Sequence, residues 1–160
     1  MRLHRRDEEG GVNRPKAIGT ATETAVVKAL RRHGFPHAER RALAGTLDQG
    51  DVTGCPGIVF EVKGGTAAKT ASDGLVVEWL AETERERVNA GAEVGVLVLQ
   101  RAGIGPANAD RWWAVLQMPV RTIEGRATGE WVPCRMTLAD ACRVLRLWGY
   151  GSPLDLEVTA

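Results

Sequence analysis

The sequence has no apolar run long enough to cross a membrane, no CxxC pair and no internal repeat. Its three cysteines, Cys55, Cys134 and Cys142, are odd in number and widely spaced. This pattern excludes a fully paired disulfide framework and a zinc knuckle. The N-terminal segment is polar and unlike a secretory signal. These absences predict a cytoplasmic protein in a reducing compartment, without a membrane partner.

The chain also has almost no net charge, but its charges are unevenly distributed. The 160 residues sum to +1, with 44% hydrophobic and 26% charged residues, as in an ordinary soluble domain. Residues 1–47 carry 10 Lys/Arg against 5 Asp/Glu, whereas residues 48–160 carry 11 against 15. A basic N-terminal third beside an acidic remainder suits a polyanion-binding surface near a metal centre. Because 17 of the basic residues are arginine, a GC-rich genome explains the excess equally well.

The pattern along the chain predicts one α/β domain after a short arm. Residues 1–15 are charged and end at Pro15, which predicts a flexible N-terminal arm, and we expect residues 16–160 to form a single domain. Helical periodicity or capping signals occur in three segments: 16–33, 75–90 and 137–148. Strand patterns occur in five segments: 37–43, 50–53, 57–63, 94–99 and 112–118. A three-strand meander, a crossover helix and a strand buried on both faces predict a central mixed sheet flanked by helices.

Two details of this prediction concern side-chain directions. The second helix is expected to carry its charged residues on the outer face: Glu82, Glu84, Arg85, Glu86 and Arg87. Trp112 and Trp113 are adjacent and cannot both face the core of a regular strand. Packing under the C-terminal helix is expected, and exposure of one of the two, for stacking or dimer contact, is the alternative.

The segment Gly50–Gly64, GDVTGCPGIVFEVKG, is the most informative for function. Alternation along its strand places Glu61 and Lys63 on one face and Ile58, Phe60 and Val62 on the other. Cleavage of a phosphodiester by a metal enzyme requires carboxylates for a hard divalent cation and a nearby positive group. The segment supplies both. The alternative is a solvent-facing ion pair between Glu61 and Lys63 at a sheet edge.

A further carboxylate in the first helix belongs to the same argument. Glu23 falls at the margin of the apolar face of that helix, where it must reach solvent or meet a positive group. A cation bound by Asp51 and Glu61 would be such a group. Two alternatives remain open: Glu23 as an exposed helical residue, and Asp48 in place of Asp51 as the ligand from that loop.

Gly50-Asp51, nine intervening residues and Glu61-x-Lys63 resemble the core motif of the PD-(D/E)xK nuclease superfamily. The helical Glu23 makes the chain most similar to Holliday junction resolvases of the archaeal type and to small phage-encoded relatives. The resemblance covers residues 16–118 and leaves residues 119–160 as a C-terminal extension. Gly50 stands where the family usually has proline.

This resemblance implies a restriction-endonuclease-like αβββαβ core that binds Mg²⁺, with Mn²⁺ as a substitute. Asp51 and Glu61 would be metal ligands, the Val62 carbonyl a third ligand, and Glu23 would support the metal directly or through water. Lys63 would orient or activate the attacking water and stabilise developing charge. The resemblance also implies a homodimer, as resolvases of this type act.

The sequence therefore predicts a Mg²⁺-dependent endodeoxyribonuclease that acts on branched DNA, most closely a junction resolvase. The alternatives are a restriction or repair nuclease of the same superfamily and a non-catalytic nucleic-acid-binding module. Seven polar residues are candidate contacts to the DNA backbone: Arg31, Arg32, Arg40, Arg41, Lys69, Gln100 and Arg101. The four arginines of the first helix and strand are equally reasonable as solvated surface, whereas a solvated lysine and a polar strand end are the preferred interpretations of Lys69 and of Gln100 with Arg101.

Overall fold

The structure, a computed structural model, describes residues 14–42, 45 and 47–155. Most of the expected N-terminal arm lies outside these residues. Its last two residues are already helical, because α1 spans Arg14–Arg32 rather than beginning at residue 16. Among the helices of the described residues, none is long and apolar enough to cross a membrane.

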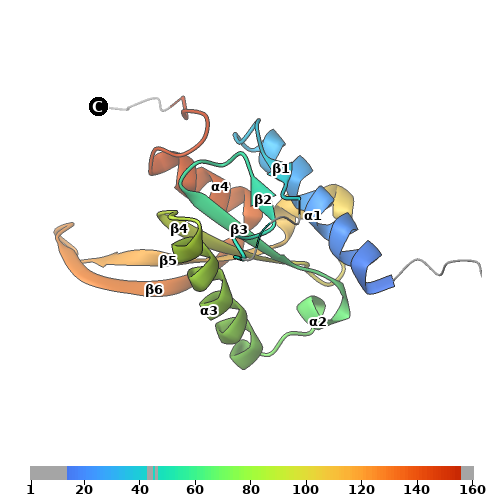
Figure 1. Cartoon of the computed structure of the whole chain (residues 1–160). Helices are drawn as coiled ribbons and strands as arrows, with labels where there is room; N and C mark the ends of the chain where they lie inside the picture. The colour runs from blue at the N-terminus through green and yellow to red at the C-terminus, as the bar shows by residue number, and fades with distance from the viewer. Residues whose placement is uncertain (1–13, 43–44, 46, 156–160) are drawn as a thin grey trace, which may run out of the picture.

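A four-stranded mixed sheet forms the centre of the molecule, in the order β3-β4-β5-β6 (Figure 1). Its strands are β3 (Ile58–Lys63), β4 (Val94–Leu99), β5 (Trp113–Arg121) and β6 (Ala127–Thr137). β3 and β4 are parallel, and the other two pairs are antiparallel. The predicted α/β class, with a mixed sheet flanked by helices, is therefore confirmed.

Helices cover both faces of this sheet, with α3 (Asp73–Asn89) on one face and α1 and α4 (Leu138–Leu147) on the other (Figure 1). Strand alternation explains the division. Phe60 and Val62 pack in the cluster that contains the apolar residues of α1 and α4. Leu97 and Leu99 pack with Val76 of α3 on the opposite face. Glu61 and Lys63 of β3 are paired in register with these two leucines, so they face α3.

The expected meander of three strands is not formed. β1 (Glu39–Arg40) and β2 (Val52–Thr53) make a separate two-stranded sheet, and β2 does not join the ladder of β3. The reason lies at Asp51, whose backbone N–H donates to the Phe60 carbonyl (2.9 Å) and whose side chain accepts from the Val62 N–H (2.8 Å). One residue thus occupies the hydrogen-bonding positions that a paired strand would use.

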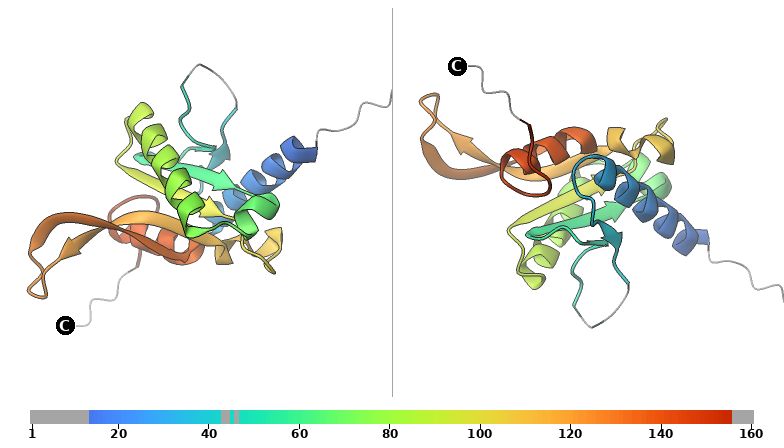
Figure 2. Two further views of the ribbon diagram at one scale, coloured as in Figure 1. Left: turned by 90° about the horizontal axis from the view of Figure 1, so that it is seen from below. Right: turned by 90° about the horizontal axis from the view of Figure 1, so that it is seen from above.

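Several elements were not predicted from the sequence. They are the short helix α2 (Gly65–Lys69), the 3₁₀ helix η1 (Pro106–Arg111) and the strand β6. Beyond its pairing with β4, β5 continues with β6 as a two-stranded ribbon that projects from the body (Figure 2). The ribbon carries exposed apolar side chains, including Trp131. Because neither side of the ribbon is covered, its sequence lacks the alternation of apolar and polar residues that identifies a half-buried strand.

Two expectations about side chains and caps can be compared directly with the fold. Thr137 caps α4 by accepting from the Asp140 N–H (3.1 Å), which confirms the predicted N-cap, while its hydroxyl, rather than the backbone N–H of a capping box, donates to the Asp140 carboxylate (2.7 Å). Trp112 is fully buried, and Trp113 is only partly buried. The two adjacent tryptophans thus divide between the core and the surface, as their adjacency predicts.

Candidate functional site

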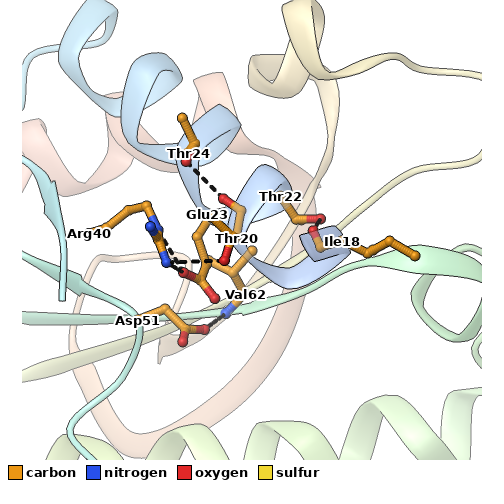
Figure 3. Close-up of polar contacts among 8 residues, drawn as sticks. All are labelled: Ile18, Thr20, Thr22, Glu23, Thr24, Arg40, Asp51 and Val62. Atoms are coloured by element: carbon orange, nitrogen blue, oxygen red, sulfur yellow. Dashed lines mark hydrogen bonds and ion pairs between the residues drawn. The ribbon is translucent and has the colours of Figure 1, made fainter. Parts of the chain in front are cut away.

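The site is built around the open edge of β3, where Asp51 is held against the strand (Figure 3). Gly50 makes this approach possible: its φ is +83°, and a Cβ there would lie 2.6 Å from Val59 Cγ1 and 2.9 Å from the Phe60 carbonyl oxygen. Only glycine adopts this conformation without strain. The glycine that replaces the proline of the related motif is therefore required by this backbone.

The backbone of Val62 presents its carbonyl oxygen to the same edge. In a strand, the N–H and C=O groups of one residue point to the same side, and those of the next residue point to the other. The Val62 N–H donates to Asp51 Oδ2 at 2.8 Å, whereas the Lys63 carbonyl accepts from the N–H of Gln100, the residue that follows β4. The Val62 carbonyl therefore faces away from β4, toward Asp51, where the resemblance requires a ligand.

Glu61 and Lys63 meet on the α3 face of β3. The Lys63 ammonium lies 2.8 Å from Glu61 Oε1 and 3.0 Å from Oε2 of Glu82, a residue of α3. It also lies 5.9 Å from the centroid of the Trp79 ring. Glu61 is only 7% exposed, so this is not a solvent-facing pair of the kind that contributes little.

The structure adds two acidic residues that the sequence analysis placed on the outer face of the second helix. Glu82 contacts Lys63, and Glu86, one turn further along α3, is 5% exposed and lines the same cleft as Glu61. The prediction is therefore wrong for these two residues. Glu84 and Arg87 pair with each other, as expected for the exposed part of the helix.

A usable signal for Glu86 was present in the sequence. Val76, Leu80 and Thr83 recur at steps of three and four residues on the inner side of α3, and Glu86 is the next position of that series. A carboxylate on the buried side of a helix has an unfavourable desolvation free energy unless it is paired or hydrogen-bonded. Such a residue is therefore a candidate functional residue.

Three carboxyl groups in this region have raised pKa values, each for reasons visible in the geometry. Burial and the neighbouring charge of Glu61 raise the pKa of Asp51 to about 7, against the hydrogen bond from Val62. Burial raises the pKa of Glu61 to about 7, because the nearby Lys63 only partly offsets it and Glu86 adds to it. Burial, with the charges of Asp48 and Asp51, raises the pKa of Glu86 to about 7. Carboxylates thus outnumber the positive charge available to them.

Lys63 shows the opposite balance. Burial lowers the pKa of its ammonium group, but hydrogen bonds and ion pairs with Glu61 and Glu82 outweigh this effect and raise the pKa above its usual value. Lys63 therefore stays protonated at neutral pH. It is equipped to donate hydrogen bonds and to stabilise negative charge, not to accept a proton.

Glu23 lies on the other side of the β3 edge, on α1, and is held by an arginine (Figure 3). Arg40 reaches it from β1 with Nε at 2.8 Å and Nη2 at 2.7 Å from Oε2. The charge of Glu23 is close enough to contribute to the raised pKa of Asp51. Glu23 thus meets a positive group, as its helical position required, but that group is Arg40.

A cleft of about 760 Å³ opens between β3 and α3 beside these residues. Five carboxylates line it, namely Asp48, Glu61, Glu82, Glu84 and Glu86, against the cations Lys63 and Arg85. Asp48, the alternative to Asp51, lies at this cleft and accepts a hydrogen bond from the Gly50 N–H at 3.2 Å. This bond gives Asp48 the turn-forming role that the sequence allowed.

The candidate DNA contacts are scattered, and most of them have structural partners. Arg31 Nε donates to the Ala38 carbonyl (2.8 Å), and the Gln100 side chain accepts from Gly65 N (2.7 Å). Arg101 lies over the Trp113 ring at 3.9 Å. Arg32 lies 3.8 Å from Asp110, Arg40 pairs with Glu23, and Arg41 contacts Gln49 at 3.4 Å. Lys69 is exposed at the end of α2. Their contact with DNA stays a prediction.

Comparison with known proteins gives no match to a family model, to a curated protein or to a solved structure. The functional argument therefore depends on the geometry and on the motif.

Proposed function

We propose that this protein is a metal-dependent endodeoxyribonuclease that hydrolyses DNA phosphodiesters at the edge of β3. The observation that carries the proposal is the juxtaposition of Asp51, Glu61 and a protonated Lys63 around the Val62 carbonyl. The charge of Glu61 helps to raise the pKa of Asp51, and the single ammonium of Lys63 is already shared between Glu61 and Glu82. A divalent cation supplies the missing charge.

The donor set fits Mg²⁺ rather than a closed structural metal. Within the described part of the chain, no three His, Cys, Asp or Glu side chains gather into a group that could hold a metal by themselves. Mg²⁺ is usually bound through one or two carboxylates, with waters and substrate phosphates completing the shell. Asp51, Glu61 and the Val62 carbonyl are a set of this kind, and Mn²⁺ accepts the same oxygen ligands.

Each residue then has a distinct role. Asp51 and Glu61 hold the cation, and the Val62 N–H fixes the orientation of the Asp51 carboxylate. Lys63 donates hydrogen bonds to the attacking water or to the phosphate and stabilises the charge that develops there. Arg40 and Glu23 hold one another beside Asp51 and position that side of the site. When bound, Mg²⁺ supplies Lewis-acid polarisation of the phosphate and lowers the pKa of water.

Branched DNA is the proposed substrate, and the motif resemblance to junction resolvases supports it. A homodimer, acting in DNA recombination, is proposed on the same resemblance. The acidic cleft beside Lys63 would repel a DNA backbone without bound cations, which is consistent with cleavage that depends on metal.

The proposal is tested by cleavage assays on labelled four-way junction, linear duplex and single-stranded DNA, in Mg²⁺ or in EDTA. We expect the wild type to cut the junction only with Mg²⁺. Lys63→Ala is expected to lose at least a hundredfold in rate, because removal of a single charge-stabilising donor has about that effect. Lys28→Ala removes the same charge from an exposed position of α1 and serves as the control.

Absence of Mg²⁺-dependent cleavage on every substrate would refute the nuclease proposal. Binding of junction DNA without cleavage would instead identify a nucleic-acid-binding module. Equal cutting of duplex and junction would refute the preference for branched DNA and favour a restriction or repair nuclease.

A further inference from the structure

Glu61 lies between two other carboxylates, and they approach it from separate directions. Asp51 lies at the strand edge, and Glu86 comes from α3 into the cleft that Glu61 also lines. Asp51 is held at the strand edge by the Val62 N–H, whereas Glu61 and Glu86 both line the cleft between β3 and α3. Glu61 is thus shared by two pairs, Asp51–Glu61 and Glu61–Glu86.

The second pair contains a polar atom without a partner. Glu86 is 5% exposed, and its Oε2 is buried without a hydrogen-bond partner. Glu86 also lines the cleft between β3 and α3. A buried charged oxygen without a partner is costly, so native proteins supply one by hydrogen bonding, pairing or a bound ion.

The protein cation that contacts Glu61 is already shared with a second carboxylate. Lys63 is shared by Glu61 and Glu82, which precedes Glu86 by one helical turn. Arg87 pairs with Glu84 on the exposed side of α3. The helix therefore places Glu82 against Lys63 and, at i+4, Glu86 in the same cleft as Glu61.

We propose that Glu61 and Glu86 hold a second divalent cation in the cleft between β3 and α3, with Glu61 bridging this site and that of Asp51. The ligands are carboxylate oxygens, which select a hard ion such as Mg²⁺ or Mn²⁺. The inference deepens the proposed function and rests on it for its role in catalysis. Two cations about 4 Å apart clamp the attacking and leaving oxygens of a phosphoryl group, and here they would also neutralise the acidic cleft.

The number of bound cations tests this inference without any measurement of catalysis. Mn²⁺ is titrated into the protein, with the bound fraction counted by isothermal calorimetry and by the loss of the free Mn²⁺ signal in electron paramagnetic resonance. We expect two equivalents in the wild type and one in Glu86→Gln. Asp51→Asn is also expected to retain one, because it removes a ligand of the other site only.

The control variant is Glu84→Gln, which removes the same charge from the same helix and the same cleft. Glu84 pairs with Arg87, so two equivalents are expected to remain. Glu86→Met, of similar length but apolar, is a second test of the ligand, and circular dichroism checks that each variant is folded.

The outcomes separate this inference from the proposed function. Two equivalents in both Glu86 variants at wild-type affinity would overturn the second site, and so would a single equivalent in the wild type that Asp51→Asn abolishes. Loss of one equivalent in both Glu86 variants, but not in Glu84→Gln, would support it. If the wild type bound two cations but cut no DNA, the site would stand and the nuclease proposal would fail.

Discussion

Replacing Glu86 by glutamine is expected to stabilise the protein at alkaline pH in the absence of metal. Glu86 is 5% exposed, and its Oε2 has no hydrogen-bond partner. Burial raises the pKa of this carboxyl from 4.5 to about 7, so its ionisation in the folded state is unfavourable. Glutamine has nearly the same shape and no charge to bury, and its amide can donate to Glu61.

The magnitude follows from linkage between protonation and folding. A group whose pKa is higher in the folded state contributes stability that is complete below the unfolded pKa and is lost as the pH rises through the folded pKa. For Glu86, that window runs from 4.5 to about 7. The wild type should therefore lose roughly 2–3 kcal/mol between pH 5 and pH 8 through this residue, and Glu86→Gln should not.

The measurement is urea unfolding in EDTA at pH 5 and pH 8 for the wild type, Glu86→Gln and Glu84→Gln. We expect the free energy of unfolding of Glu86→Gln, relative to the wild type, to increase by roughly 2–3 kcal/mol from pH 5 to pH 8. Glu84→Gln, at a site paired with Arg87, should show a much smaller change. A difference between Glu86→Gln and the wild type that is the same at both pH values would refute the reasoning, because it would mean that Glu86 does not titrate as a buried carboxyl.

Three further predictions concern the scaffold, each checked by thermal or urea unfolding. Gly64→Ala is expected to lower the free energy of unfolding by about 1–3 kcal/mol, because its methyl group would overlap the Thr22 side chain of α1. Thr22→Ala should recover part of this loss in the double variant, and additive losses would contradict the contact. Leu145→Ala should cost about 2–5 kcal/mol because Leu145 is fully buried, whereas Leu147→Ala, at a residue 53% exposed, should cost under about 1 kcal/mol; similar values would mean that α4 packs by another face. Thr137→Ala should cost about 1 kcal/mol by removing the cap of α4, and an unchanged midpoint would refute the cap.

Whether a strand could be predicted from the sequence depended on how much of it is buried. β4 was predicted because a strand covered on both faces reads as a continuous apolar run. β6 was missed because much of it lies beyond the covering helices, where the need to bury one face no longer selects its residues. The prediction of a three-strand meander was wrong because β2 pairs with β1 and not with β3. No local sequence pattern indicates that the Asp51 side chain accepts the hydrogen bond from the edge of β3 that a paired strand would accept.

The candidate site divides in the same way. Glu61 and Lys63 were found because the strand period fixes which residues share a face, and Asp51 was found from its spacing to them; the structure holds Asp51 at the edge of the same strand. Glu86 was missed because it lies in a run of charged residues, where helical amphipathicity predicts exposure. The inner stripe of α3 extends through this run, so the position of a residue on the helix was a better guide than the polarity of its neighbours.

The added carboxylates bear on whether Glu61 and Lys63 are only an ion pair. An ion pair selected for stability needs balanced charges, and Lys63 with Glu61 already satisfies this requirement. Three more carboxylates, Asp51, Glu82 and Glu86, lie around the same ammonium group or its partner. Each of them adds repulsion, and burial of Glu86 adds a desolvation cost. A purely structural pair is weakened by such neighbours, whereas a site for divalent cations requires them, which is why the charge excess supports the proposed metal chemistry more strongly than the motif does.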